Sequence, residues 1–209
     1  SDDKKTLNEI KEIGKKMEES ISEYFYSKNL NDPTANFDWE YILIDNKKIR
    51  NAWCMPGGKI AFYTGILPIA KNDNGIAAIM GHEIAHAFAR HTVEKLTQHS
   101  IVSLGTQGLL ATKYGKIVAQ NSEIYNNVVQ FGIMLPFSRT MESEADYMGL
   151  AFMNLSGFDM NESVKVWERM KDASKVSNPE FMSSHPSPDN RIKNIRQWID
   201  EVSITYSLV

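Results

Sequence analysis

The sequence predicts an α+β fold that is mainly α-helical and has a small sheet of about three strands in its N-terminal third. Two observations predict it. Apolar residues recur at helical spacing over most of the chain, and this period is interrupted only between about residues 39 and 65, where short runs of β-branched and aromatic residues alternate with turn signals. We find no internal repeat and no low-complexity linker, so we expect residues 1–209 to form a single domain.

The composition is that of a soluble globular protein and restricts the class of function. Of the 209 residues, 42% are apolar and 23% are charged, a balance that supports a packed core and differs from that of a disordered chain. The net charge of −3 leaves no basic surface of the kind that binds nucleic acid. Cys54 is the only cysteine, which excludes an internal disulfide and a multi-thiolate zinc site; we expect it to be buried.

The sequence contains no predicted transmembrane span. Its two most apolar stretches, residues 101–112 and 128–137, are too short or too interrupted to cross a bilayer. We expect residues 128–137 to belong to the core, with the lining of a substrate groove or contact with a membrane surface as alternatives. The chain opens with SDDKKTLNEIKEI, which is neither an initiator methionine nor an apolar signal segment, so we expect that a leader was removed.

The first predicted element is an amphipathic helix over residues 6–28, in which Lys and Glu separate apolar residues at helical spacing. Three strands are predicted next, in WEYILID, NAWCM and IAFYTG, with turns at DNKK and PGGK. We expect Gly57 and Gly58 to serve the second turn. The strand within GKIAFYTG lies either inside the sheet or at an edge, where it could pair with an extended peptide through main-chain hydrogen bonds.

Helical spacing returns after residue 74 and predicts four further helices. They span residues 75–96, 140–155, 160–175 and 188–201. The first two of these four helices carry most of the candidate site residues.

The stretch GHEIAHAFARH, residues 81–91, predicts a metal site. His82 and His86 are four residues apart and therefore lie on one face of a helix, as two imidazoles must to share one zinc ion. Glu83 projects to the side, where it could take a proton from metal-bound water without becoming a ligand. The alternative is an ordinary helix with two surface histidines. However, the neighbouring residues are small or apolar, and two buried histidines are costly unless they are used.

His91 is a tempting third ligand that the geometry of a continuous helix excludes. It lies nine residues beyond His82 and therefore about 180° around the helix axis. A metzincin-type site would also need a histidine at position 92 and a glycine at position 89, where this sequence has Thr92 and Ala89. We expect His91 to mark the end of the helix or to contact a ligating residue from outside the metal site.

The third ligand is expected to be a carboxylate within SRTMESEADYMGLAF. Glu142 and Asp146 are four residues apart and share one helix face, while Glu144 is expected to point toward solvent. Glu142 can bind the metal, and Asp146 can accept a hydrogen bond from the far nitrogen of a ligating histidine. The spacing alone does not decide which of the two carboxylates is the ligand, and a solvated acidic face is the alternative to both roles.

The motifs GHEIAH, SRTMESEAD and SHPSPDNRI, together with NAWCMPGGKIAFYTGIL, resemble the gluzincin metallopeptidase family that contains HtpX and the type 1 CaaX prenyl protease. The resemblance runs from about residue 39 to 198. It implies a zincin-like fold and one zinc ion per chain, with Glu142 as the third ligand and Asp146 as the residue that orients a histidine. The membrane helices of HtpX and the CaaX protease are absent from this sequence. The chain is therefore more similar to soluble, secreted bacterial members, and prenyl-protein cleavage is not carried over.

The motif SHPSPDNRI has two interpretations. As a structural element it caps the last helix, with Ser187 or Asp189 at the cap. The resemblance instead places it over the zinc cleft. We hypothesise that His185 donates a hydrogen bond to the developing oxyanion or, in a resting state, caps the zinc ion. We also hypothesise that Arg191 steadies Glu142 or the substrate.

The predicted activity is the hydrolysis of peptide bonds in protein or peptide substrates, as part of protein quality control. Zinc and Glu83 would generate the nucleophile from water, and Glu83 would pass the proton to the leaving amine. The alternatives are a chaperone-like metal-binding protein with little proteolytic activity and a structural zinc domain. Glu83 favours the enzyme, because a structural site needs no base beside its ligand. The resemblance also implies an extracytoplasmic location, either periplasmic or associated with a membrane.

Overall fold

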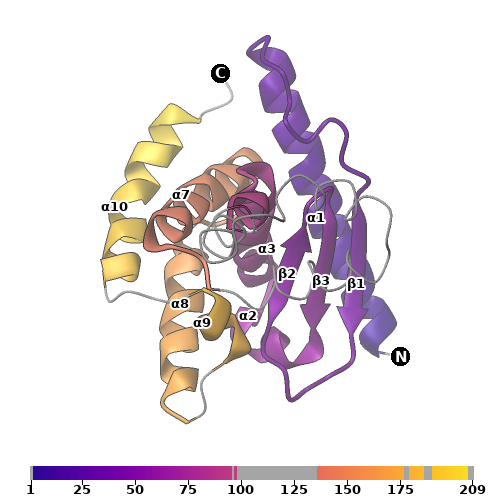
Figure 1. Ribbon diagram of the computed structural model, residues 1–209, viewed down its shortest axis with the longest axis vertical. Coiled ribbons are helices and arrows are strands. Elements are labelled where there is room, and N and C mark those ends of the chain that lie inside the picture. The colour runs from indigo at the N-terminus through magenta and orange to yellow at the C-terminus, as the bar shows by residue number, and fades with distance from the viewer. Residues whose placement is uncertain (1, 96, 98–135, 177–178, 186–189, 207–209) are drawn as a thin grey trace, which may run out of the picture.

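The computed structural model describes residues 2–95, 97, 136–176, 179–185 and 190–206. The predicted mainly helical α+β architecture with a three-stranded sheet is confirmed (Figure 1). The elements, in chain order, are α1 (Asp2–Ser27), β1 (Glu40–Ile44), β2 (Ala52–Met55), β3 (Lys59–Tyr63), a 3-10 turn η1 (Thr64–Ile66), α2 (Leu67–Ala70), α3 (Asp73–Phe88), α7 (Arg139–Leu155), α8 (Asn161–Ser174), α9 (Glu180–Ser184) and α10 (Asn190–Thr205). No helix within these described residues is long and apolar enough to span a bilayer.

The sheet has the strand order β1-β3-β2, so that β3 is its central strand. Strand β3 pairs parallel with β1 and antiparallel with β2. Of the two positions foreseen for the GKIAFYTG strand, the structure shows the internal one, and β2 is an edge strand instead. In the turn between β2 and β3, Gly57 and Gly58 have φ angles of 90° and 89°. This left-handed conformation favours glycine, as the turn prediction required.

Helix α1 packs against the sheet and leaves room for an aromatic side chain of β1 (Figure 1). A Cβ atom added at Gly14 would lie 2.1 Å from the ring of Tyr41. The absence of a side chain at this position therefore lets the Tyr41 ring reach α1, where its hydroxyl donates a hydrogen bond to Glu18. The buried face of the helix is formed by Ile10, Ile13, Met17 and Ile21.

Helix α3 lies between the sheet and the helices α7, α8 and α10 (Figure 1). Its N-terminus is capped by Asn72, whose side-chain oxygen accepts a hydrogen bond from the backbone N–H of Gly75 at 2.9 Å. Every residue from Gly75 to Ala87 is buried. The polar side chains on this stretch are consequently buried as well, and they need partners inside the protein.

Helices α3 and α7 approach each other closely because each carries a glycine at the crossing. A Cβ atom at Gly149 would lie 3.0 Å from the backbone nitrogen of His82, and one at Gly81 would lie 3.0 Å from the carbonyl oxygen of Gly149. A larger residue at either position would push the two backbones apart. This close crossing brings the acidic face of α7 next to the histidines of α3.

The prediction of a single helix over residues 75–96 is wrong at its C-terminal end. Helix α3 ends at Phe88, Arg90 adopts a φ of 57°, and a new helical segment begins at His91. A positive φ is incompatible with a right-handed helix, so the chain changes direction at this point.

The other predicted helices are confirmed with small shifts of their ends. Residues 6–28, 140–155 and 160–175 correspond to α1, α7 and α8, and residues 188–201 correspond to α10. The short elements η1, α2 and α9 were not predicted. Most of the apolar stretch 128–137 lies outside the described residues, as do the candidate caps Ser187 and Asp189.

Candidate metal centre

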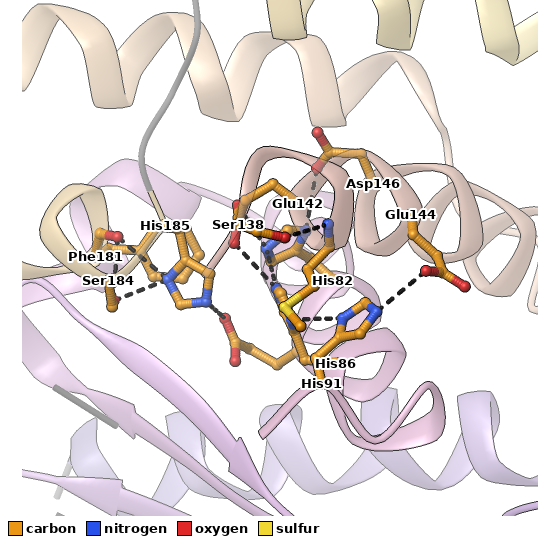
Figure 2. A network of polar contacts seen from close by, with 12 residues as sticks. His82, His86, His91, Ser138, Glu142, Glu144, Asp146, Phe181, Ser184 and His185 are labelled. Atoms are coloured by element: carbon orange, nitrogen blue, oxygen red, sulfur yellow. Dashed lines mark hydrogen bonds and ion pairs between the residues drawn. The ribbon is translucent and has the colours of Figure 1, made fainter. Parts of the chain in front are cut away.

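Four side chains that could hold a metal ion converge where α3, α7 and the end of α9 meet (Figure 2). One nitrogen or carboxylate oxygen from each of them lies within 4.8 Å of the others, and all four side chains are buried. They are His82, His86, Glu142 and His185. The remaining residues singled out from the sequence, Glu83, Asp146 and Arg191, contact members of this cluster.

Three of these groups have the spacing of a tetrahedral zinc site. His82 Nε2 lies 3.1 Å from His86 Nε2 and 3.6 Å from Glu142 Oε2. His86 Nε2 lies 3.4 Å from Glu142 Oε1. Ligand atoms bound at about 2.1 Å to a tetrahedral ion are about 3.4 Å apart. The three groups therefore fit a single zinc ion.

The outer nitrogens of both histidines already have partners. His82 Nδ1 lies 3.1 Å from Asp146 Oδ1, and His86 Nδ1 lies 3.0 Å from His91 Nδ1. When the hydrogen of each ring is on Nδ1, each Nε2 carries a lone pair. The two lone pairs then face each other across 3.1 Å. Arg191 Nη2 lies 3.2 Å from His82 Nε2 and can donate to its lone pair, and a cation between the two nitrogens would remove their repulsion, so the cluster suits a cation.

The electrostatic environment favours the metal-binding form of the imidazoles. Burial lowers the pKa of His82, His86 and His185 well below its usual value. The guanidinium of Arg191 lowers the pKa of His82 further. Metals bind the neutral imidazole, so these histidines are held in the form that a ligand needs.

Glu83 lies beside the cluster and is held by the edge strand. Its Oε2 accepts a hydrogen bond from the backbone N–H of Cys54 in β2 at 3.2 Å, and its Oε1 lies 3.4 Å from His185 Nε2. Burial raises the pKa of Glu83 well above its usual value, and the nearby carboxyl of Glu142 raises it further. A buried carboxyl group with a raised pKa, aimed at a candidate metal site, has the properties of a general base. Cys54 itself is buried, as predicted.

Arg191 of α10 binds both buried carboxylates of α7. Its Nη1 lies 2.5 Å from Glu142 Oε2, while its Nε and Nη2 both pair with Asp146, Nη2 at 2.7 Å. The guanidinium lies over the ring of Trp167, 3.7 Å from its centroid, which restricts its position further. The contact with Glu142 agrees with one of the roles hypothesised from the sequence. The pairing with Asp146 and the contact with Trp167 were not predicted.

His185 follows α9, a short helix that is anchored to the loop before β2. The backbone N–H of Phe181 donates to the carbonyl of Arg50, and Glu180 accepts a hydrogen bond from the backbone N–H of Arg50. The ring of His185 stacks on Phe181 with centroids 4.3 Å apart. Its Nδ1 lies 3.2 Å from the carbonyl oxygen of Phe181 and 2.9 Å from Ser184 Oγ. These contacts direct Nε2 toward Glu83.

Two residues near the cluster were not singled out from the sequence. Phe137 stacks on His86 with ring centroids 3.9 Å apart, and the ammonium group of Lys95 lies 3.4 Å from the centroid of Phe137. Burial lowers the pKa of Lys95 to about 8. No spacing rule links these residues to the histidines. The sequence signals are that Phe137 ends the apolar stretch 128–137 and directly precedes the SRTMESEAD motif.

His91 and Glu144 lie outside the cluster and contact each other. His91 stands just beyond the end of α3 and touches His86 from outside the candidate metal site, as expected (Figure 2). The Glu144 side chain is 54% exposed, also as expected, but its Oε2 lies 3.2 Å from His91 Nε2. This second contact was not predicted.

Comparisons with known proteins identify the family of the chain. The chain matches Peptidase family M48 over residues 10–199. It is 40% identical over 176 residues to the mitochondrial metalloendopeptidase OMA1 of Saccharomyces cerevisiae, which covers 80% of this chain and 49% of that protein. It is 25% identical over 172 residues to the beta-barrel assembly-enhancing protease of Escherichia coli, covering 78% of this chain and 35% of that protein. The chain thus spans between a third and a half of the length of these relatives. On the family match and the 40% identity, the chain belongs to peptidase family M48, a family of metallopeptidases.

Proposed function

We propose that this chain is a zinc-dependent endopeptidase that hydrolyses peptide bonds of protein substrates, with one zinc ion bound by His82, His86 and Glu142. The observation that carries the proposal is the convergence of two imidazole nitrogens and one carboxylate, all buried, at the spacing of a tetrahedral zinc site. Two histidines and one glutamate form a known donor set of catalytic zinc sites. The metalloendopeptidase names of the relatives support the same activity.

We assign proton transfer to Glu83. When bound, the zinc ion would polarise a substrate carbonyl and lower the pKa of a water molecule. The raised pKa of Glu83 makes it a stronger base than an exposed glutamate, so it can accept a proton from that water and return it to the leaving amine nitrogen. The hydrogen bond from Cys54 holds Oε2 and leaves Oε1 directed into the cluster.

For His185 the geometry favours capping of the zinc ion in a resting state over hydrogen-bond donation to an oxyanion. The capping role requires the hydrogen of the imidazole to be on Nδ1, where the Phe181 carbonyl oxygen, which can only accept, lies 3.2 Å away, closer than the 3.4 Å between Nε2 and Glu83 Oε1. Nε2 then carries a lone pair, which can bind a cation but cannot donate. Nε2 also has no hydrogen-bond partner among the residues that the structure describes.

The two roles of His185 predict opposite results for His185→Ala. If His185 caps the zinc, the variant retains the metal and cleaves an unfolded protein at least as fast as the wild type. If His185 donates to the oxyanion, kcat falls by about 10²–10³. Turnover of casein and zinc content, measured on the same preparations, distinguish these outcomes, and a fall in kcat with zinc retained would contradict the capping role.

We propose that the substrate pairs with the outer edge of β2. Strand β2 is the edge strand next to α3, and the backbone N–H of Cys54 points away from β3 toward Glu83. Alternate residues of a strand direct their main-chain groups to the same side, so Ala52 shares this outward direction with Cys54, and its N–H donates to Asn51 Oδ1 at 3.0 Å. An extended peptide that took the place of the Asn51 side chain at this edge would pass beside the proposed base.

The proposed activity is tested by casein turnover with the purified chain, with and without a chelator. We expect turnover that is lost on chelation and restored by zinc. We expect Glu83→Gln to retain one zinc ion and to lose at least about 10²-fold in kcat, since a general base contributes this much. Glu12→Gln, at an exposed position on α1, is the control and should keep wild-type turnover.

The same experiment separates the endopeptidase from its alternatives. A wild-type chain that binds zinc without hydrolysing casein would favour a chaperone-like or structural zinc protein. A wild-type chain that binds no zinc would contradict all three.

The proposed setting is protein quality control outside the cytoplasm. It is supported by the resemblance to secreted bacterial members and by the name of the Escherichia coli relative, a beta-barrel assembly-enhancing protease. Fractionation of the source cells tests the location, and recovery of the chain in the cytoplasmic fraction would contradict it.

A further inference from the structure

We propose that His91 and Glu144 are positioning residues of the metal centre, which fix the ring of His86 in the orientation that directs its Nε2 into the cluster. The proposal rests on the proposed zinc site and extends it to two residues that are neither candidate ligands nor in contact with the proposed base. It starts from a continuous line of polar contacts that leads from the cluster to the surface (Figure 2).

The contacts form a chain of three side chains from three parts of the sequence. His86 Nδ1 lies 3.0 Å from His91 Nδ1, and His91 Nε2 lies 3.2 Å from Glu144 Oε2. His86 belongs to α3, His91 follows the break after α3, and Glu144 belongs to α7. These contacts therefore connect His86 to α7, the helix that also carries Glu142 and Asp146.

Only one placement of the imidazole hydrogens of His86 and His91 leaves His86 able to bind a metal. His86 Nε2 must keep its lone pair, so its hydrogen is on Nδ1, and His91 Nδ1 must accept it. His91 then has its hydrogen on Nε2, where it donates to the carboxylate of Glu144, which can only accept. A carboxylate at the far end thus favours the tautomer of His86 that a ligand needs.

The rings of the two histidines on α3, His82 and His86, are oriented by similar contacts. His82 contacts the carboxylate of Asp146 directly at 3.1 Å, and this carboxylate is buried and paired with Arg191. For His86 the carboxylate is one side chain further away, with His91 between them. Both carboxylates come from α7, so this helix would supply the third ligand and the support of the first two.

The backbone supports the same role. If α3 continued beyond Phe88, residue 91 would lie about 180° around the axis from His82 and could not reach the back of His86. The turn at Arg90, with a φ of 57°, brings His91 to that position. A left-handed conformation is unfavourable for a residue other than glycine, and besides Arg90 it occurs among the described residues at Asn29 and Lys71, so the support comes from where this turn places His91.

Packing alone would account for only part of this arrangement. His91 is 1% exposed and lies near Phe137, with ring centroids 6.4 Å apart, so it contributes to packing. Packing does not require each of its two nitrogens to meet a polar atom at hydrogen-bond distance. It also does not require Glu144, which is half-exposed, to lie within reach of a buried ring.

The test is the dissociation constant for zinc, measured on the full chain by competition with a chromophoric chelator. We expect His91→Ala to weaken zinc binding by about 10–100-fold, the range found for residues that support metal ligands. His91→Asn should restore most of the affinity, because its side-chain oxygen can accept the hydrogen bond from His86. Glu144→Ala should weaken binding by a smaller factor, and its exposed position keeps the fold intact. Glu12→Ala, another exposed glutamate, is the matched control and should leave the affinity unchanged.

A second measurement separates positioning from packing. The visible absorption spectrum of the cobalt-loaded chain reports ligand geometry. We expect it to change in His91→Ala and to return toward the wild-type spectrum in His91→Asn. The melting temperature of the metal-free chain should respond to lost packing in both variants.

Each outcome decides a specific point. Equal zinc affinity in the wild type, His91→Ala and Glu144→Ala would overturn the positioning role. Equal losses in His91→Ala and His91→Asn, with Glu144→Ala unchanged, would also overturn it, because they would show that only packing matters. Failure of the wild-type chain to bind zinc would instead contradict the proposed function. Zinc-dependent casein turnover by the wild type, together with wild-type zinc affinity in the variants, would contradict the positioning role and leave the proposed function intact.

Discussion

The carboxyl group of Glu83 is buried between the backbone of Cys54 and the imidazole of His185. In the metal-free chain, burial and the neighbouring Glu142 carboxyl raise its pKa well above the usual value. The folded state therefore binds the proton of Glu83 more tightly than the unfolded state, in which the pKa is about 4.3. The stability contributed by this group is fully present below about pH 4 and is lost as the pH rises toward the raised pKa.

This reasoning predicts that Glu83→Gln stabilises the metal-free chain at neutral pH. The neutral amide can still accept the hydrogen bond from Cys54, and it removes the buried carboxyl that ionises unfavourably. We expect the variant to have a higher free energy of unfolding than the wild type at pH 7, and the two to converge at pH 4 and below. Denaturant unfolding of chelator-treated protein measures this difference, with Glu12→Gln as the control. A wild type that is more stable than Glu83→Gln at pH 7 would contradict the prediction.

Most candidate site residues were predictable from the sequence, because helical spacing determines which side chains share a face. His82, Glu83 and His86 follow from one helix, and Glu142 with Asp146 follow from another. The choice between the two carboxylates needed the family resemblance. Their roles remain predictions until metal binding is measured.

The contacts of Lys95 and Phe137, and that of His91 with Glu144, could not be predicted from the sequence. They depend on the break of α3 at Arg90, a backbone angle that no sequence pattern signals here. The pairing of Arg191 with Asp146 likewise depends on how α10 packs against α7.

The contact between Gly81 and Gly149 determines how closely α3 and α7 approach each other. It thereby determines the distance between the histidines of α3 and Glu142 of α7. Gly149→Ala would place a Cβ atom 3.0 Å from the backbone nitrogen of His82, and backbone atoms cannot move aside as a flexible side chain can. We expect a loss of stability of about 1–3 kcal/mol, the usual cost of overpacking. We also expect weaker zinc binding, because the shift of α7 moves Glu142 away from the histidine pair.

The control for this variant is Ser143→Thr, which adds one methyl group at a partly buried position of the same helix. Unfolding by urea and zinc competition measure both effects. Wild-type stability and zinc affinity in Gly149→Ala would show that the helix crossing does not determine the geometry of the site.

The elements themselves were predicted well, whereas their arrangement was only partly predicted. Periodicity located the three strands and the long helices within a few residues, because each buries one face, except that the helix predicted over residues 75–96 ends at Phe88. The central position of β3 and its parallel pairing with β1 depend on contacts between segments far apart in the sequence. The short helix α9 is stabilised by its contacts with Arg50 and not by a pattern of its own.

Over the whole molecule, the proposed zinc ion would join α3 to α7, and Arg191 extends this connection to α10. Zinc that binds only the folded state stabilises it by mass action. We expect about 4 kcal/mol at a free zinc concentration 1,000 times the dissociation constant, seen as a rise in melting temperature. Glu142→Gln should reduce this rise strongly at the same zinc concentration. A melting temperature that does not depend on zinc would contradict a site built from the folded chain.

The chain covers only a third to a half of the length of the OMA1 and Escherichia coli relatives described above, so their substrates and partners do not transfer to it. The organisation of residues 1–209 as one domain also remains a prediction. The conclusion about function therefore depends on the metal centre, which lies entirely within the described residues.

The most direct test is a crystal structure of the zinc-loaded chain with anomalous scattering recorded at the zinc absorption edge. We predict one strong peak at about 2.0–2.2 Å from His82 Nε2, His86 Nε2 and a carboxylate oxygen of Glu142. The absence of a peak between these three side chains, or a zinc ion bound elsewhere with Glu142 turned away, would contradict the proposed metal centre.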